Sequence, residues 1–319
     1  MKACLAKATA NDVPLRSTID HSVAAADIVA IRRSLGIDSW MLFTTVGAAD
    51  IAMHLFKADA AAITAYAARD PYAVGTAGDT TSLAEAFDRF AADCAASPTC
   101  ATNGDLRAKF AAGLARLKTP ITTKTVEKVT GNPGVVLDAL STQTGVRFAL
   151  RTPNFAGLLP GLLGGIGTGE ADEVVAGFNA STEAISEPAG VAFGCQDLGY
   201  EFPPLAPAGD DKAGLFAGMT IKRYCDAIGP IPKLDAPPKI TSHIPVFVML
   251  SSYESRSSET IAKSLFSGFT NATFVPVPGV SAAGIKIGCY PTTIAAFFNA
   301  PTAPLDASCL SSPDGRVFT

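Results

Sequence analysis

Apolar residues at the start of the chain recur with two different periods, which predict helices and strands in turn. In segment 22–35 they fall near helical spacing, with Asp20 placed to cap the first turn and Gly36 to end the helix. Two short apolar runs typical of buried strands follow at residues 40–44 and 62–67. A second helical segment, residues 48–56, lies between them. Such an order of helices and strands predicts a parallel α/β sheet.

The same pattern returns at the end of the chain. The run at 244–250 is continuously apolar, as expected of a strand covered on both faces of a parallel sheet. A helix is predicted at 258–269, a short strand at 273–277 and a last helix at 292–298. Both ends of the chain therefore contribute strands to the predicted sheet.

Between these two parts the pattern is mostly helical. Proline and glycine separate predicted helices at residues 83–94, 106–117, 132–141, 155–166, 171–186 and 215–228. The simplest organisation is a discontinuous α/β core formed by residues 1–70 and 239–319. A helical lid, residues 71–238, is inserted between the two halves of this core.

Composition narrows the classes of function. The chain has 319 residues, of which 48% are hydrophobic and 17% charged, and its net charge is −4. No cluster of lysine and arginine forms the basic face that nucleic acid requires, so nucleic-acid binding is not expected. No apolar run reaches the length of a membrane span, and the N-terminus has no apolar signal-peptide core. The glycines at 161–169 lack the lysine of a phosphate-binding loop.

The seven cysteines are an odd number. They are compatible either with buried free thiols in a cytosolic protein or with disulfides in an exported one. We favour disulfides, because Cys94 and Cys100 flank a turn-rich spacer that can close a short loop. No cysteine or histidine spacing indicates zinc, and we expect no metal and no cofactor.

Several segments, in this order and at suitable distances, resemble one protein family. They are residues 27–36, 40–43, 90–100, 244–246, 277–279 and 303–310. Together they resemble the exported α/β-hydrolases related to prolyl iminopeptidase and tripeptidyl aminopeptidase, over nearly the whole chain. The resemblance implies an α/β-hydrolase-like, mostly parallel sheet with a large helical lid.

The family's mechanism needs three side chains that this chain does not supply together. A serine sits on a sharp strand-to-helix turn, a histidine takes its proton and an acid orients the histidine. By resemblance this turn is residues 44–48, with Val46 at the serine position. The acid position falls on Glu254 and the histidine position on Ala282, and no histidine follows His243. The resemblance therefore implies that the triad is lost.

Family members also carry strands and an oxyanion loop before the first helix found here. By this comparison the chain begins beyond them, and we expect the sheet edge at 40–44 to be open. A second chain or self-association would then complete that edge. Resemblance and spacing together give the disulfide pairs Cys94–Cys100, Cys195–Cys225 and Cys289–Cys309, and leave Cys4 alone.

Other residues are weak candidates to restore catalysis. Thr45 lies beside the lost nucleophile and Ser281 lies in the former histidine loop, but neither has an evident base. The histidines at 21, 54 and 243 are expected to be capping or packing residues, and Asp50 to be a first-turn acid that favours its helix dipole. The serines at 251, 252, 255, 257 and 258 are expected to form a polar loop around Glu254.

Three hypotheses about function follow from these observations. The first is a non-catalytic binding or assembly subunit, whose core–lid cleft takes a peptide or an apolar small molecule. The alternative is a peptidase-like or esterase-like hydrolase with relocated catalytic residues in that cleft. The third is a nonfunctional remnant of a gene. The resemblance and the cysteines imply a secreted or cell-envelope location.

Overall fold

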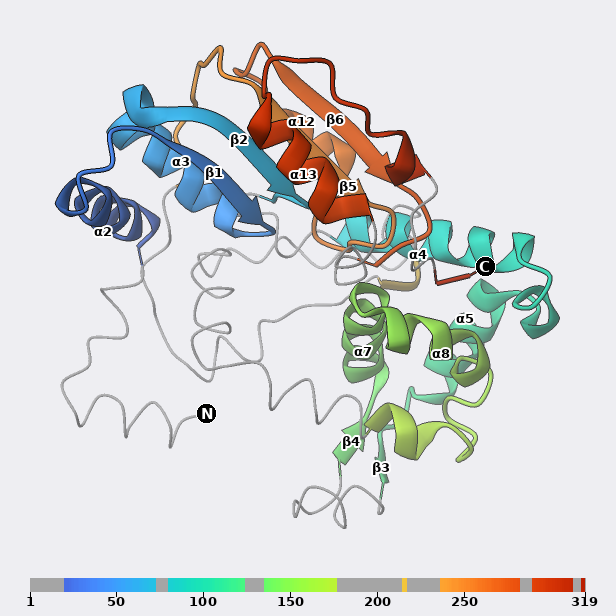
Figure 1. Ribbon diagram of the computed structural model, residues 1–319. Helices are drawn as coiled ribbons and strands as arrows, with labels where there is room; N and C mark the ends of the chain where they lie inside the picture. Colours follow the sequence, from blue (N-terminus) through green and yellow to red (C-terminus); the bar gives the residue numbers. More distant parts are fainter. Residues whose placement is uncertain are drawn as a thin grey trace, which may run out of the picture.

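The core of the protein is a four-stranded parallel sheet. The computed structural model describes residues 20–72, 80–123, 135–176, 214–216, 236–281, 289–311 and 317–318. The strands run in the order β1 (Trp40–Thr45), β2 (Ile63–Arg69), β5 (Val246–Ser251) and β6 (Ala272–Val277). All three pairings are parallel. The predicted α/β class, and a sheet built from both ends of the chain, are confirmed (Figure 1).

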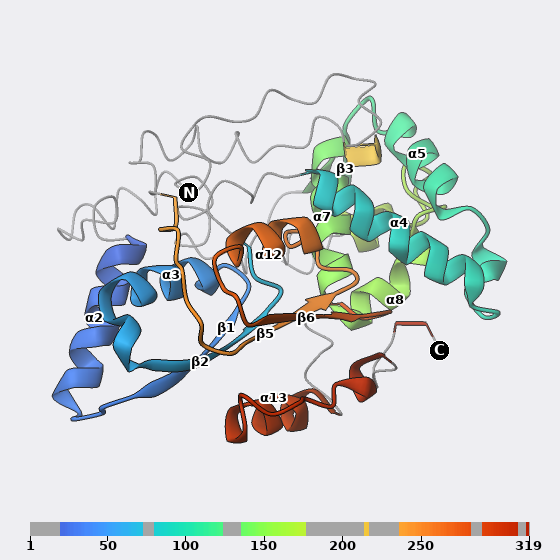
Figure 2. The ribbon, with the colours of Figure 1, turned by 90° about the horizontal axis from the view of Figure 1, so that it is seen from above.

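Helices cover both faces of this sheet. One face carries α2 (His21–Ser34), α3 (Ala48–Asp59) and α12 (Glu259–Leu265), and the other carries α13 (Cys289–Asn299) (Figure 2). Successive side chains of a strand point to opposite faces, so Tyr66 packs with the first group of helices and Ala67 with α13. β5 is buried along its whole length, which explains its continuous apolar sequence.

Local sequence signals explain the first elements. The Asp20 side chain accepts a hydrogen bond from the backbone N–H of Ser22, as expected of a helix cap. Gly36, with φ of 65°, follows the end of α2 in the left-handed conformation that glycine adopts without strain. The predictions at 22–35, 40–44, 48–56 and 62–67 each correspond to an observed element.

A second group of helices lies beyond the carboxyl ends of the strands, and we call it the helical lid. It consists of α4 (Thr80–Ala96), α5 (Leu106–Arg116), α7 (Ala139–Arg151) and α8 (Pro153–Leu162). An antiparallel pair, β3 (Ile121–Thr123) and β4 (Val135–Leu137), accompanies them. The lid has an apolar core of its own, with Phe87, Phe90 and Phe110 at its centre. The domain boundaries at 70 and 239 stay a prediction.

The predicted helix at 132–141 is wrong. Residues 135–137 form β4, and the helix begins only at Ala139. The start is set by a capping box, in which Asp138 accepts from the Ser141 N–H and Ser141 Oγ accepts from the Asp138 N–H. The predicted helices 155–166 and 258–269 both end earlier in the structure, at Leu162 and Leu265. Most of the predicted helices 171–186 and 215–228 lies outside the described residues, although 172–176 is helical.

Four short 3₁₀ turns complete the described elements. They are η1 (Ala60–Ala62), η2 (Ala101–Asn103), η3 (Gly214–Phe216) and η5 (Ser308–Ser311).

The loop that follows β5 joins the core to the lid. The Arg89 Nε of α4 donates to the Ser252 carbonyl at 2.8 Å, and the Tyr253 hydroxyl donates to the Asp93 carboxylate at 2.6 Å. The Tyr253 ring is fully buried among the lid's apolar residues and lies edge-on to Phe90. Contacts between lid and core therefore gather on a few consecutive residues of this loop.

Two of the predicted disulfides occur in the structure. Cys94 pairs with Cys100 at the end of α4, and Cys289 pairs with Cys309 across α13 and η5. The third predicted pair, Cys195–Cys225, and the lone Cys4 lie outside the described residues. Within the described residues, no helix combines the length and apolar content that a membrane crossing requires.

The outer edge of β1 has no partner among the described strands. Two apolar side chains of this strand, Met41 and Phe43, are 47% and 45% exposed. They lie on the face that α13 covers elsewhere in the sheet, and the Phe43 ring only approaches Tyr290 at 6.5 Å. Leu42, on the opposite face, is buried under α3.

Candidate functional site

The parallel strands bring the predicted triad region to one edge of the sheet. Since carboxyl ends of parallel strands meet at the same edge, the residues that follow β1, β2, β5 and β6 gather there. They include Val46, Asp70, Glu254 and Ser281. Ala282, the predicted histidine position, lies outside the described residues.

Val46 adopts the sharp strand-to-helix turn that the sequence predicted. Its φ is 49°, a left-handed conformation that a β-branched residue rarely adopts. The Val46 N–H donates to the Arg69 carbonyl at 2.8 Å, which fixes the turn to the end of β2. The Val46 carbonyl accepts from the Ala49 N–H at the start of α3. The turn thus has a positive φ between a strand and a helix, and the valine side chain on it has no proton to lose and no lone pair with which to attack.

Tyr72 packs directly against this turn. A Cβ added to Gly47 would lie 2.7 Å from the Tyr72 hydroxyl oxygen, so this position accepts only glycine unless Tyr72 moves. On its other side, the Tyr72 ring lies 4.8 Å from the Arg256 guanidinium, which also donates to the Tyr72 hydroxyl at 3.3 Å. Tyr72 and Arg256 thus connect the turn to the acid loop.

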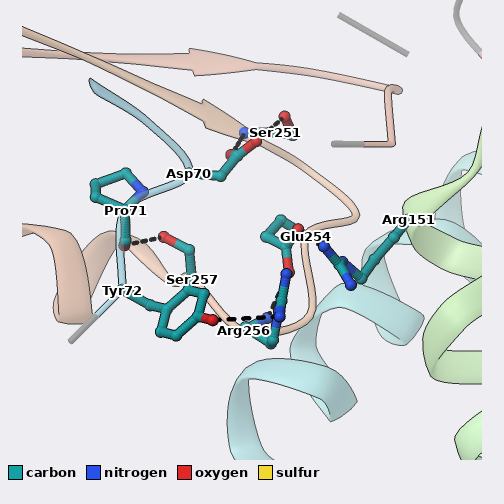
Figure 3. Close-up of polar contacts among 8 residues, drawn as sticks. All are labelled: Asp70, Pro71, Tyr72, Arg151, Ser251, Glu254, Arg256 and Ser257. Atoms are coloured by element: carbon teal, nitrogen blue, oxygen red, sulfur yellow. Dashed lines mark hydrogen bonds and ion pairs between the residues drawn. The ribbon is translucent and has the colours of Figure 1, made fainter. Parts of the chain in front are cut away.

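Glu254, the predicted acid, is completely buried and is held by cations (Figure 3). Arg151 Nε donates to its Oε2 at 3.1 Å, and the Arg256 backbone N–H donates to its Oε1 at 2.9 Å. The Arg256 guanidinium lies 3.5 Å from the same Oε1. Burial by itself raises the pKa of Glu254, but Arg151 and Arg256 outweigh it and hold the pKa below its usual value. Both carboxylate oxygens are therefore engaged by arginines.

Arg147 adds a further positive charge. It lies one helical turn before Arg151 on α7, so the two side chains share one face of the helix. Burial lowers the pKa of Arg147 to about 10, and repulsion from Arg256 and Arg151 adds to this effect. Arg151 and Arg256 thus contact the Glu254 carboxylate and Arg147 adds its charge nearby, and we call these three residues the arginine cluster.

Asp70 was not predicted to be part of this edge. It directly follows β2, is fully buried and has a φ of 48°. Its carboxyl accepts from the Ser251 N–H at 2.6 Å and from the Ser251 hydroxyl at 2.7 Å, which ties the end of β2 to the end of β5. Burial raises the pKa of Asp70 to about 7, and the negative charge of Glu254 adds to the rise. Because Ser251 is also buried, this pair does not offer a nucleophile to a ligand.

The weak rescue candidates do not acquire a base. Thr45 ends β1 opposite Arg69, and Ser281 is fully buried with a hydroxyl that has no hydrogen-bond partner among the described residues. All three histidines of the chain lie in described parts, and the contacts of each lie away from Thr45 and Ser281. His21 lies where α2 packs on α3. Its Nδ1 is 3.8 Å from the Asp50 Oδ2, and its ring centroid is 6.4 Å from that of His54. His243 contacts Thr270 before β5, at the opposite edge of the sheet from Glu254.

The serines near Glu254 are mainly structural. Ser252 Oγ donates to the Val277 carbonyl, Ser257 Oγ donates to the Pro71 carbonyl, and Ser258 Oγ caps α12 by accepting from the Ile261 N–H. These bonds fit the expected polar loop. In the described parts of the chain, no group of three or more histidine, cysteine or acidic side chains is arranged to hold a metal ion.

The chain has a distant structural likeness among known proteins but no assigned family. No family model matches it, and no curated protein matches it. It is similar in structure to MGS-M2, an α/β-hydrolase enzyme from a Medee basin deep-sea metagenome library, with 12% identity and a TM-score of 0.38. That match covers 91% of this chain and 75% of that chain. At such identity and TM-score, the chemistry of that enzyme is not carried over to this chain.

Proposed function

We propose that this chain is a non-catalytic binding protein, built on an α/β-hydrolase-like core, whose arginine cluster recognises a negatively charged group on its ligand. The observation that carries the proposal is the state of Glu254. A triad acid must accept a hydrogen bond from a histidine, yet both oxygens of this carboxylate are held by Arg151 and Arg256. Together with a valine at the nucleophile turn, this arrangement supports binding and not hydrolysis.

The partly exposed arginines of the cluster support an anionic ligand. Asp70 at the same edge of the sheet is partly protonated near neutral pH because its pKa is about 7, which lowers the negative charge beside the arginines. The Arg151 and Arg256 side chains are 27% and 20% exposed, so they remain accessible to a ligand although they contact Glu254. Arginine forms two parallel hydrogen bonds with a carboxylate or a phosphate, which suits this role. The two disulfides support the proposed exported location.

A first experiment tests the absence of hydrolysis. Hydrolysis of p-nitrophenyl acetate and of short peptide substrates should stay at background, and a fluorophosphonate probe should not label the protein. Val46→Ser should not restore activity, because no histidine faces the turn and triad members act as a unit. Turnover that a serine-directed inhibitor abolishes would favour the alternative, a hydrolase with relocated catalytic residues.

A second experiment tests the anion. Succinate should raise the melting temperature at constant ionic strength, whereas neutral succinamide should not. Arg256→Gln should weaken succinate binding about tenfold or more, because one hydrogen bond to a charged group contributes a free energy of that size. Arg107→Gln, which removes an exposed arginine of α5, is the matched control. Glu254→Gln should strengthen binding, since it removes the competing carboxylate. Equal losses in the two arginine variants would contradict the proposal.

A further inference from the structure

The helical lid contains a cavity that the arginine cluster does not use. α7, α8 and the helical residues 172–176 enclose about 210 Å³. The wall is almost entirely apolar and includes Val146, Ala149, Leu159, Leu163, Ile166 and Val175. Among the described residues, no charged side chain lines it. Phe155, Leu158 and Val174 also line the cavity and are 38%, 54% and 52% exposed, so the cavity reaches the surface.

This cavity lies on the opposite face of α7 from the arginine cluster. Val146 and Ala149 line it, whereas Arg147 and Arg151 point to the core. At 100° per residue these two pairs project to opposite sides of the helix. The cavity is thus a separate site.

One wall residue indicates what the cavity holds. Thr142 is completely buried, and its hydroxyl has no hydrogen-bond partner in the described parts of the chain. A buried hydroxyl without a partner is unfavourable, and a ligand that offers a hydrogen-bonding group removes the penalty. A charged head group is disfavoured, because no charge in the described wall compensates the loss of its hydration.

We propose that the lid cavity binds an uncharged aliphatic molecule of roughly eight carbons with one hydrogen-bonding group, placed against Thr142. The size follows from the volume, since an apolar cavity of about 150 Å³ holds benzene. A medium-chain alcohol meets each requirement: it fills the apolar wall, it carries no charge, and its hydroxyl pairs with that of Thr142. A polypeptide partner fits less well, because its backbone would bring many polar groups into a cavity whose wall offers one hydrogen-bonding side chain.

The test uses the full chain with 1-octanol and octanoate as probes. 1-Octanol should raise the melting temperature and bind with one-to-one stoichiometry in calorimetry, and octanoate should bind at least tenfold more weakly. Thr142→Val keeps the shape of the side chain and removes the hydroxyl, so it should weaken the binding of 1-octanol about five- to tenfold. Thr144→Val is its matched control on the same helix, because the Thr144 hydroxyl bonds to the Leu140 carbonyl and does not line the cavity.

A variant that fills the cavity gives a second, independent test. Ala149→Leu places a larger side chain in the cavity and should abolish 1-octanol binding while succinate binding at the arginine cluster persists. If this variant does not fold, the comparison of Thr142→Val with Thr144→Val decides alone. The proposal is overturned if octanoate binds as tightly as 1-octanol, if Thr142→Val binds 1-octanol as the wild type does, or if no 1-octanol binds.

Discussion

Val46 adopts a costly backbone conformation although its side chain is apolar and β-branched. A left-handed conformation costs a non-glycine residue about 1–2 kcal/mol. At this position the neighbours favour it: the Val46 N–H donates to the end of β2, and Tyr72 occupies the space that a Cβ on the following Gly47 would need. The strain is therefore a property of the packing around the turn and does not depend on a catalytic side chain.

Relief of this strain should stabilise the protein. Asparagine tolerates the left-handed conformation better than valine, so Val46→Asn should raise stability by about 1 kcal/mol. The corresponding rise in melting temperature is about 2 °C for a chain of this size. Thr45→Asn is the control, because Thr45 belongs to β1 and has no positive φ, and it should destabilise. Equal losses in both variants would show that Val46 is not strained.

The buried Asp70 should make stability depend on pH. Its pKa is about 7 in the folded protein, compared with 3.8 for an ordinary aspartate, so between these values the folded state keeps a proton that the unfolded state releases. The contribution of Asp70 to stability therefore falls as pH rises from about 4 to 7. Asp70→Asn removes this term and tolerates the positive φ. The melting temperature of the variant, relative to wild type, should rise between pH 5 and pH 8.

A control separates this effect from a general change of charge. Asp88→Asn removes the same negative charge, but from an exposed carboxylate of α4. Its melting temperature should follow that of the wild type at a constant offset across the same pH range. Parallel curves for Asp70→Asn as well would contradict the assignment.

At the scale of elements, the sequence predicted the sheet well and the lid less well. Strand β5 and helix α2 carry unambiguous signals, a continuous apolar run and a capped helical period. The segment at 132–141 does not, because three apolar residues before Asp138 suit the first turn of a helix as well as a short strand. Only the pairing of β4 with β3 decides between the two, and that contact is not local in sequence.

The residues of the candidate site were likewise predicted only in part from the sequence. The turn at Val46 and the acid position Glu254 were predicted from the resemblance to the hydrolase family. Arg147, Arg151 and Asp70 were not, because nothing in their local sequence shows which residues will face them. Arg147 and Arg151 have the i, i+4 spacing that places two charges on one helix face, and this was the available signal. Its significance depends on the position of α7 against the acid loop.

The two disulfides should differ in their contribution to stability. The loop closed by Cys94–Cys100 is short, whereas Cys289–Cys309 spans a sequence separation of 20 residues. The chain-entropy relation gives about 2 kcal/mol for the first and about 3 kcal/mol for the second. Replacing each pair by serines and measuring denaturant unfolding checks the order. A larger loss for the Cys94–Cys100 pair would contradict the expectation.

At the scale of the whole molecule, the outer edge of β1 has no strand partner among the described residues. The exposed side chains of Met41 and Phe43 lie along this edge, and four apolar residues on and after α2 are exposed as well: Val23, Ile31, Leu35 and Ile37. Exposed strand edges favour pairing with another strand. We propose that a second copy of the chain covers this edge, because two-fold pairing buries the same patch on both copies.

Light scattering as a function of concentration tests this proposal. The wild type should form a dimer at low micromolar concentration, and the double variant Met41→Lys, Phe43→Lys should be monomeric with an unchanged far-UV circular dichroism spectrum. A wild type that remains monomeric and melts cooperatively would show that the edge needs no partner.

The short loop after β5 has a consequence for how related sequences can diverge. Bonds from the lid to the core end on Ser252, Tyr253 and Glu254, and their partners are Arg89, Asp93 and Arg151. In a set of homologues, Tyr253 and Glu254 should covary with Asp93 and Arg151, whereas the Arg89 contact, made to a backbone carbonyl, should constrain position 252 weakly. Recombination that exchanges lids between homologues should then succeed when these adjacent codons travel with the lid.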